Sequence, residues 1–339
     1  MIDEDLQLSS YDYTLPKECI AIKPSKPKEK AKLLVYEKDK DKITHAEFGS
    51  LCEFLPQCAI VFNDTKVIKA RIYGQKQNGT SCELFFHKAL SEYEFLAQIK
   101  GRVKIGDILS FKANLKAQIL ALNDDGTRKV RFFTQKNLNT KELFALLEKI
   151  GHIPLPPYIK RADTEQDSLD YQSILAKNAG AVAAPTASLH FSHLMLENLA
   201  QKHPIYTLTL HIGAGTFQSV QCEDIRQHKM HEEYYCVSDE IATLIRSEKP
   251  ILGIGTTSTR CIEYVARTGI LQGQCDLFLH PQNKPLRQNY LLTNFHLPKS
   301  TLIMLVASFI GRTKTLELYE IAIKKGYKFY SYGDAMLIV

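Results

Sequence analysis

The 339-residue sequence predicts an α/β protein that carries a small all-β unit inserted into a larger domain. After Gly151, strand and helix patterns alternate, which is typical of α/β domains. Residues 70–135 instead hold two hairpin signals, at Asn78-Gly79 and at Asn123–Gly126, with no helical periodicity between them. The length corresponds to about two domains. We therefore expect a β insertion over residues 64–150 and one α/β domain over residues 1–63 and 151–339.

Local signals assign the individual elements in chain order. Residues 1–32 contain three prolines and are predicted to be irregular, with five lysines between positions 23 and 32. Asn139 can open a short amphipathic helix through a capping box, and Ser192 and Ser300 can cap later helices. We expect strands over residues 33–36, 59–62, 205–212, 251–254 and 327–332, and helices over 140–150, 193–199, 301–310 and from about 258.

Composition excludes several classes of protein. The chain has 43 Lys and Arg against 37 Asp and Glu, a net charge of +6, which is compatible with an anionic partner. Eight cysteines without a C-x-x-C pair argue against a disulfide scaffold and against structural zinc. The start MIDEDL is acidic, unlike a signal peptide, and the longest apolar run is too short to span a membrane. We expect a cytoplasmic location, free thiols and no membrane partner.

Two segments join a predicted strand to glycines or to a helix start. In TLHIGAGTF, His211 lies on one face of the predicted strand near its end, and Gly213, Gly215 and Thr216 follow the strand. The segment favours either a ligand site at a strand's carboxyl end or a tight turn with a hydrogen-bonded histidine. In GTTSTR, the N–H groups of a helix start can attract a carboxylate or a phosphate. Plain capping explains one hydroxyl residue there, but not all of Thr256, Thr257, Ser258 and Thr259, which precede Arg260.

Two further segments place histidines beside other polar residues. In HKMHEEYY, His228 and His231 stand three apart, which on a helix could hold a metal. No third ligand is suggested nearby, so a pair of hydrogen-bonding histidines that line a cleft is the preferred interpretation. In TNFHLPKST, Asn294, His296 and Lys299 precede the helix at 301–310, either as a ligand loop or as its cap.

Three short segments remain ambiguous when taken alone. In FNDTK, an Asx turn is sufficient to explain Asn63 and Asp64, which precede Thr65. GAVAAPTASLHFS, which contains Thr186 and His190, favours a tight buried loop. In YSYGDAML, Tyr330 and Tyr332 can stack on a base or simply pack, and Asp334 follows them.

Taken together, these segments, with PLPPYI and YQSILA between them, resemble the S-adenosylmethionine:tRNA ribosyltransferase-isomerase family of queuosine biosynthesis. The resemblance runs from about Tyr11 to the C-terminus. It implies a monomer with a large barrel-like α/β domain and a smaller barrel-like β domain. It also implies transfer and isomerisation of the ribosyl group of S-adenosylmethionine onto 7-aminomethyl-7-deazaguanine at the tRNA wobble position. The products would be epoxyqueuosine-tRNA, adenine and methionine.

The resemblance further implies partners and site residues. The partners are S-adenosylmethionine, consumed as a co-substrate, and a tRNA anticodon arm, with no metal and no bound cofactor. Lysines at 23–32 and at 324, 325 and 328 are candidates for phosphate contacts. Histidine suits the proton transfers because its pKa lies near neutrality. The catalytic candidates are His190, His211, His228, His231, His296, Asp64 and Asp334. The substrate-binding candidates are Asn63, Thr65, Arg71, Thr186, Gly213, Gly215, Thr216, Thr256, Thr257, Ser258, Arg260, Asn294, Lys299 and Tyr332.

We expect at least two of these histidines to meet in one cleft. Arg260 and the turn at 256–259 are expected to hold a carboxylate, most plausibly the methionine end of the substrate. Two other function classes stay open. An S-adenosylmethionine-dependent methyltransferase is disfavoured because no early G-x-G-x-x-G follows a first strand. A non-catalytic tRNA-binding protein would not need the dense histidine, aspartate, arginine and threonine segments.

Overall fold

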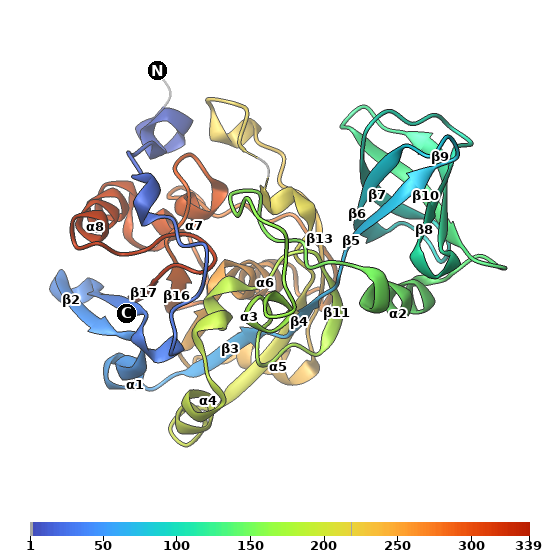
Figure 1. Cartoon of the computed structure of the whole chain (residues 1–339). Helices are drawn as coiled ribbons and strands as arrows, with labels where there is room; N and C mark the ends of the chain where they lie inside the picture. Colours follow the sequence, from blue (N-terminus) through green and yellow to red (C-terminus); the bar gives the residue numbers. More distant parts are fainter. Residues whose placement is uncertain (1–2, 218) are drawn as a thin grey trace.

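The computed structural model describes residues 3–217 and 219–339. It consists of a large α/β body and a small closed β-barrel that stands beside it (Figure 1). This confirms the predicted fold class. In the described part of the chain, every helix is too short or too polar to cross a bilayer.

The large body is built on a nine-stranded sheet with the order β15-β13-β12-β3-β14-β16-β17-β1-β2. Its four central strands, β12, β3, β14 and β16, are parallel, while β17 runs antiparallel to β16. The strands are β1 Lys32–Glu37, β2 Lys42–Glu47, β3 Ala59–Asn63, β12 Ile205–Leu210, β13 Glu233–Cys236, β14 Ile251–Ile254, β15 Gln272–Cys275, β16 Tyr290–Asn294 and β17 Ala335–Ile338.

The strand directions bring distant parts of the chain to one edge of the sheet. Because the central strands are parallel, the residues that follow them emerge at a common carboxyl edge. Ala335 of β17 pairs with Asn294 of β16, so the residues just before β17 reach this edge as well. The predicted polar segments that follow β3, β12, β14 and β16 are therefore neighbours in space.

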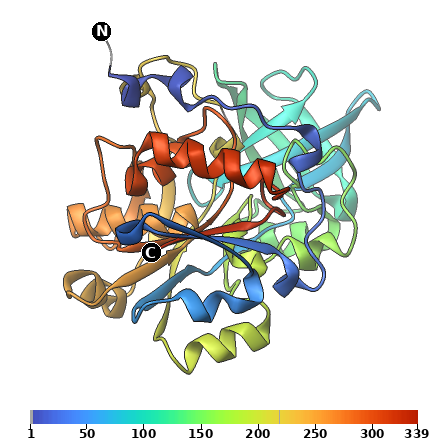
Figure 2. The same ribbon diagram turned by 90° about the vertical axis from the view of Figure 1, so that its left-hand side faces the viewer.

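Helices cover both faces of the sheet (Figure 2). Along β17, Met336 and Ile338 pack in the core formed with α7 and α8, whereas Ala335 and Leu337 pack in the core formed with α1 and α4. This alternation is the period of two that a strand imposes. The helices are α1 Leu51–Phe54, α2 Thr140–Ile150, α3 Asp167–Asp170, α4 His193–Ala200, α5 Asp239–Arg246, α6 Gly255–Thr268, α7 Thr301–Ile310 and α8 Arg312–Lys324.

The closed barrel has six strands in the order β10-β7-β6-β5-β8-β9. Both predicted hairpins are confirmed, at the β5–β6 and β9–β10 turns, and α2 follows with the predicted Asn139 capping box. The strands are β5 Arg71–Lys76, β6 Ser81–Ala89, β7 Phe95–Lys100, β8 Ile108–Phe111, β9 Lys116–Leu122 and β10 Thr127–Phe133. The domain limits at 64 and 150 stay a prediction. Within them, β4 (Thr65–Val67) pairs with β11 (Asn178–Ala181) and not with the barrel.

Two local predictions are wrong. No strand forms over 327–332, because Tyr330 has a positive φ of 72°, and only a single bridge joins Phe329 to Ile20. Helix α6 begins at Gly255 and not near 258, since the φ of +83° at this glycine turns the chain directly at the end of β14. The disfavoured metal alternative for His228 and His231 required a helix, and both residues lie in an irregular segment before β13.

Candidate functional site

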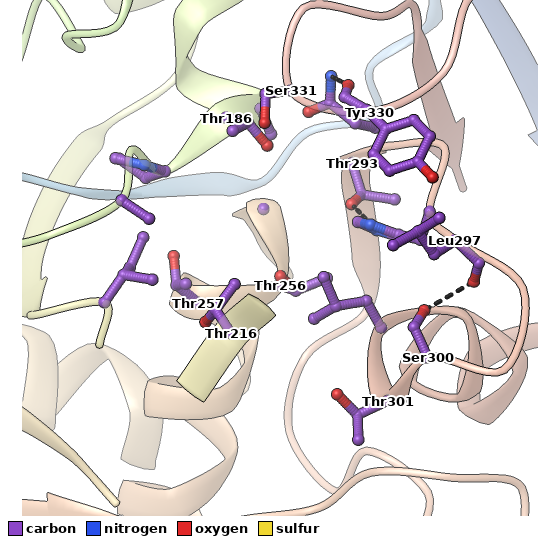
Figure 3. A pocket seen from close by; sticks show the side chains of 18 of the residues that line it. Thr186, Thr216, Thr256, Thr257, Thr293, Leu297, Ser300, Thr301, Tyr330 and Ser331 are labelled. Carbon is purple, nitrogen blue, oxygen red and sulfur yellow. Dashed lines mark hydrogen bonds between the residues drawn. The ribbon is translucent and has the colours of Figure 1, made fainter. Parts of the chain in front are cut away.

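A cavity of about 300 Å³ lies at the carboxyl edge of the large sheet. We call it the hydroxyl-rich cavity, because threonine and serine side chains from several segments surround it (Figure 3). Eight predicted site residues line it together, as do Tyr158 and Tyr330, whose ring centroids are 4.3 Å apart. The eight predicted residues are Thr186, Thr216, Thr256, Thr257, Arg260, Asn294, His296 and Lys299.

Two helices begin at this cavity. The first residues of α6, Gly255–Thr257, and those of α7, Ser300–Leu302, belong to its lining. N–H groups in the first turn of a helix have no partner within the helix, and the helix dipole places partial positive charge there. One of them, that of Ile303, is capped by the predicted Ser300 side chain. The cavity therefore offers N–H groups to a carboxylate or a phosphate.

Asn294 presents an unsatisfied acceptor to the same cavity. Its Nδ2 donates to Nε2 of His190 and to the carbonyl oxygen of Tyr330, each at 3.2 Å. Its Oδ1 is buried and has no hydrogen-bond partner among the described residues. Burial lowers the pKa of His190 to about 4, so His190 is neutral and able to accept this hydrogen bond. His190 thus orients the Asn294 side chain, and the Oδ1 atom of Asn294 is available to accept a hydrogen bond from a ligand.

A buried ion pair forms the wall behind these groups. Arg260 pairs with Glu233 and also donates to the carbonyl oxygens of Leu277 and Cys275, at 3.0 and 3.1 Å. Glu233 additionally accepts the N–H of Gly213 at 2.9 Å. Arg260 was expected to hold a ligand carboxylate, but its guanidinium is occupied by these partners. The guanidinium neutralises the Glu233 carboxylate.

A second cavity of about 420 Å³ lies between the barrel and the large body. We call it the interdomain cavity. His211, Gly213, Gly215 and His231 of the predicted set line it. Ile212 and Glu233 line both cavities, so the two spaces share one wall.

Two glycines make room for two of the three histidine rings that line this cavity. A Cβ on Gly180 would lie 2.7 Å from the His211 ring, and one on Gly215 would lie 2.3 Å from the His231 ring. The His211 ring is held by a 2.8 Å hydrogen bond between its Nδ1 and the Thr65 hydroxyl, and it stacks on Tyr234. Burial lowers the pKa of His211 against the opposing effect of Asp64, which favours the neutral ring.

The remaining predicted residues mainly support the structure. Asn63 binds the backbone of Leu210 and the Thr257 hydroxyl, and Asp64 accepts from Thr209 at 2.7 Å and from Asn178 at 3.1 Å. Asp334 accepts the N–H groups of Lys32 and Lys328, each at 2.7 Å, and burial raises its pKa. None of these three lines either cavity, and the same holds for Thr65, Arg71, His190, His228, Ser258 and Tyr332.

Several of these excluded residues have evident local partners. Arg71 lies 3.3 Å from Glu83 within the barrel, and His228 packs edge-on against Phe278. Lys299, which does line the hydroxyl-rich cavity, pairs with Asp12 at 2.5 Å. Reasoning from sequence missed Glu233 and Tyr158 in the hydroxyl-rich cavity and His87 in the interdomain cavity. Of these, only Glu233 had a local signal, its place two residues after His231. Tyr330, considered from the sequence as a residue that could stack on a base, lines the hydroxyl-rich cavity.

Two buried histidines, His190 and His296, predict an acid-sensitive fold. Burial lowers the pKa of His190 to about 4 and that of His296 to about 3, against about 6.5 in the unfolded chain. Below pH 6.5 the unfolded state therefore binds more protons, so this stability is present above pH 6.5 and is lost as the pH falls. We expect the free energy of unfolding to drop by roughly 2–3 kcal/mol per pH unit near pH 5.5. Urea titrations of the wild type and of His190→Gln check this, and an equal slope in both would contradict it.

Comparison with known proteins places the chain among named relatives. A family model described as a queuosine biosynthesis protein matches residues 8–338. The S-adenosylmethionine:tRNA ribosyltransferase-isomerase of Campylobacter jejuni (strain RM1221) is 62% identical over 342 residues, which cover 100% of each chain. The protein of the same name from Campylobacter fetus subsp. fetus (strain 82-40) is 57% identical, and the match covers 98% of each chain. The crystal structure of S-adenosylmethionine tRNA ribosyltransferase from Thermotoga maritima matches with a TM-score of 0.55 at 30% identity, over 97% of this chain and 99% of that chain.

Proposed function

This chain belongs to the queuosine biosynthesis family of S-adenosylmethionine:tRNA ribosyltransferase-isomerases, and we propose that it binds S-adenosylmethionine in the hydroxyl-rich cavity. The enzyme is a transferase-isomerase. It moves the ribosyl group of S-adenosylmethionine onto 7-aminomethyl-7-deazaguanine in tRNA and releases adenine and methionine. We assign particular residues of the hydroxyl-rich cavity to the adenine, the ribose and the methionine carboxylate of this substrate.

The observation that carries the assignment is the free Oδ1 of Asn294 in a cavity where two helices begin. The adenine amino group supplies the donor that this oxygen lacks. The methionine carboxylate fits the first turn of α6 or α7, where N–H groups and the Thr256 hydroxyl converge. Tyr158 and Tyr330 offer aromatic faces to the adenine ring, and the remaining hydroxyls suit the ribose.

The reaction requires balanced proton transfers. The sulfonium acidifies ribose C5′, which loses one proton, and the attacking amine loses another. Adenine leaves with the electron pair of its glycosidic bond and gains one proton, while the other proton passes to solvent. The electron pair of the C5′–S bond leaves with sulfur, so methionine departs as a thioether. His296 is neutral because burial lowers its pKa to about 3, and Nε2 of its ring is held by Thr293 at 2.8 Å. We assign it to positioning.

We also propose the cofactor requirement, the bound region of the tRNA, the oligomeric state and the location of the enzyme in the cell. S-adenosylmethionine supplies the reactive sulfonium itself, so no metal or further cofactor is assigned. We assign the anticodon arm as the tRNA region that is bound, the monomer as the active form and the cytoplasm as the location.

Replacing Asn294 by leucine tests the substrate assignment. We expect the dissociation constant for S-adenosylmethionine to rise roughly 10- to 100-fold, because a directed hydrogen bond is lost. An analogue without the 6-amino group should bind the wild type and Asn294→Leu about equally weakly. Calorimetry measures both ligands, circular dichroism checks folding, and Asn137→Ala, which alters an exposed barrel residue, is the control. If Asn294→Leu kept the wild-type preference for the amino group, the assignment would be wrong.

A second assay separates the function classes. With modified tRNA present, the enzyme should release adenine and free methionine. Release of S-adenosylhomocysteine would indicate a methyltransferase, and release of no product would indicate a binding protein.

A further inference from the structure

We propose that the interdomain cavity receives the modified tRNA nucleotide, with its base turned out of the anticodon loop and held between the barrel and the large body. This inference rests on the proposed function and specifies where its second substrate binds. Turning a base out of a single-stranded loop costs little free energy, because no base pair is broken. Four observations support the placement.

The first observation is the position of the cavity. The barrel supplies one side of it, through Phe86–Ala89 and Asp125, and the large body supplies the other, through Gly180, residues 211–215 and residues 231–234. A base attached to an RNA chain must enter from the surface, and several lining residues are exposed, including Lys88, Ala89 and His231. A volume of about 420 Å³ falls within the range of ligand pockets.

The second observation is the shared wall. Ile212 and Glu233 line both cavities, so a base in one lies next to a ribosyl donor in the other. Group transfer needs this proximity, because the attacking amine must reach the sugar. Glu233 is held in place by Arg260 and by the N–H of Gly213, so it lies beside both substrates at the point where the two cavities meet.

The third observation is an unsatisfied nitrogen on the barrel side. Nε2 of His87 is buried and has no hydrogen-bond partner among the described residues. Burial also lowers the pKa of His87 to about 4, so the ring is neutral and can either donate or accept at this nitrogen. A buried polar atom without a partner at a cavity wall indicates a ligand that carries the matching group, such as the edge of a purine-like base.

The cavity also suits the exocyclic amine of this base. A primary alkyl amine is protonated near neutral pH and must lose a proton before it attacks. Asp125 and Glu232 are carboxylates in the lining that attract the ammonium form. His211, whose ring is held neutral by burial, stands in the same lining as an acceptor for the proton.

The fourth observation is charge. Residues 71–133 contain eleven Lys and Arg and six Asp and Glu, so the barrel carries +5 of the chain's net +6. The exposed Lys88 at the cavity has no ion-pair or hydrogen-bond partner among the described residues and is free to meet a phosphate. Most of the lysines first considered for this role are engaged within the protein. Lys26 pairs with Asp170, Lys30 pairs with Glu47, and Lys32 and Lys328 donate to backbone carbonyls.

Two substitutions of His87 test the base contact. His87→Phe keeps a ring and removes the nitrogen, whereas His87→Gln can place an amide near the position of Nε2. We measure the dissociation constants for an anticodon stem-loop that carries either the modified base or guanine at the wobble position. His87→Phe should weaken binding of the modified stem-loop about 10-fold. It should also change the ratio between the dissociation constants of the modified and the guanine stem-loops. His87→Gln should restore much of the affinity for the modified stem-loop.

Charge substitutions test the phosphate contact. Lys88→Glu should weaken both stem-loops alike and reduce the salt dependence of binding, and Lys104→Glu, on an exposed loop outside both cavities, is the matched control. In all four variants the affinity for S-adenosylmethionine should stay within two-fold of the wild type. Unchanged stem-loop binding by both His87→Phe and Lys88→Glu would overturn the inference. A loss of S-adenosylmethionine affinity in His87→Phe would overturn it as well. If Asn294→Leu kept the wild-type preference for the 6-amino group while the His87 and Lys88 variants behaved as expected, only the proposed S-adenosylmethionine site would be wrong.

Discussion

Replacing Arg260 by methionine is expected to lower the free energy of unfolding by about 3–5 kcal/mol and to abolish ribosyl transfer. The substitution leaves the Glu233 carboxylate buried without its counter-charge, and the exposed fraction of Glu233 is only 4%. The guanidinium also satisfies two backbone carbonyls, which would lose their donors. Activity should fall because Glu233 forms the wall between the two cavities.

Urea unfolding and a single-turnover assay measure these two effects. Arg226→Met is the matched control, since Arg226 forms a solvent-exposed pair with Asp224 and should contribute little to stability. The double variant Arg260→Met with Glu233→Met should recover much of the stability and none of the activity. A loss of less than about 1 kcal/mol in Arg260→Met would show that the pair is not the brace that the geometry indicates.

Replacing His211 by glutamine is expected to reduce the single-turnover rate of adenine release by roughly 10²- to 10⁴-fold. The neutral imidazole is the proposed acceptor of the proton from the attacking amine, and an amide cannot take that role. The Thr65 hydroxyl and Tyr234 hold the ring in place, so the loss reports chemistry together with position.

The pH profile separates a proton acceptor from a structural brace. In the wild type the rate should fall as the pH drops through the pKa of His211, which burial places below its usual value. His211→Gln should be slow and should lack this step, while His193→Gln, on the exposed start of α4, should behave as the wild type. If His211→Gln were slow but kept the wild-type pH profile, the residue would be a brace and the acceptor would lie elsewhere.

The elements that the sequence predicted well are those with local signals. The caps at Asn139, Ser192 and Ser300 are made within three residues, and the hairpin turns are likewise local. A buried apolar run that ends in glycine or polar residues, as at Ile254 and Gly255, predicts a parallel strand and the position of its carboxyl end. The carboxyl edge of the sheet, and the eight predicted residues around the hydroxyl-rich cavity, could therefore be predicted from the sequence.

The contacts that the sequence could not predict join distant segments. Arg260 on α6 meets Glu233 on β13, which lies 27 residues earlier, so its charge is used inside the protein. His87 faces the large body only because the closed barrel stands against it. Asp334 and Asn63, predicted as site residues, form hydrogen bonds to backbone groups of segments distant in the sequence, which no local pattern predicts.

A crystal structure with S-adenosylmethionine and a modified anticodon stem-loop would show directly whether the two substrates occupy the two neighbouring cavities. We predict the adenine amino group at Oδ1 of Asn294, the methionine carboxylate at the start of α6 or α7, and the modified base between His87 and His211. The aminomethyl nitrogen and the ribose should then lie next to each other, beside Ile212 and Glu233. S-adenosylmethionine bound in the interdomain cavity, or a base bound away from the barrel, would contradict this account.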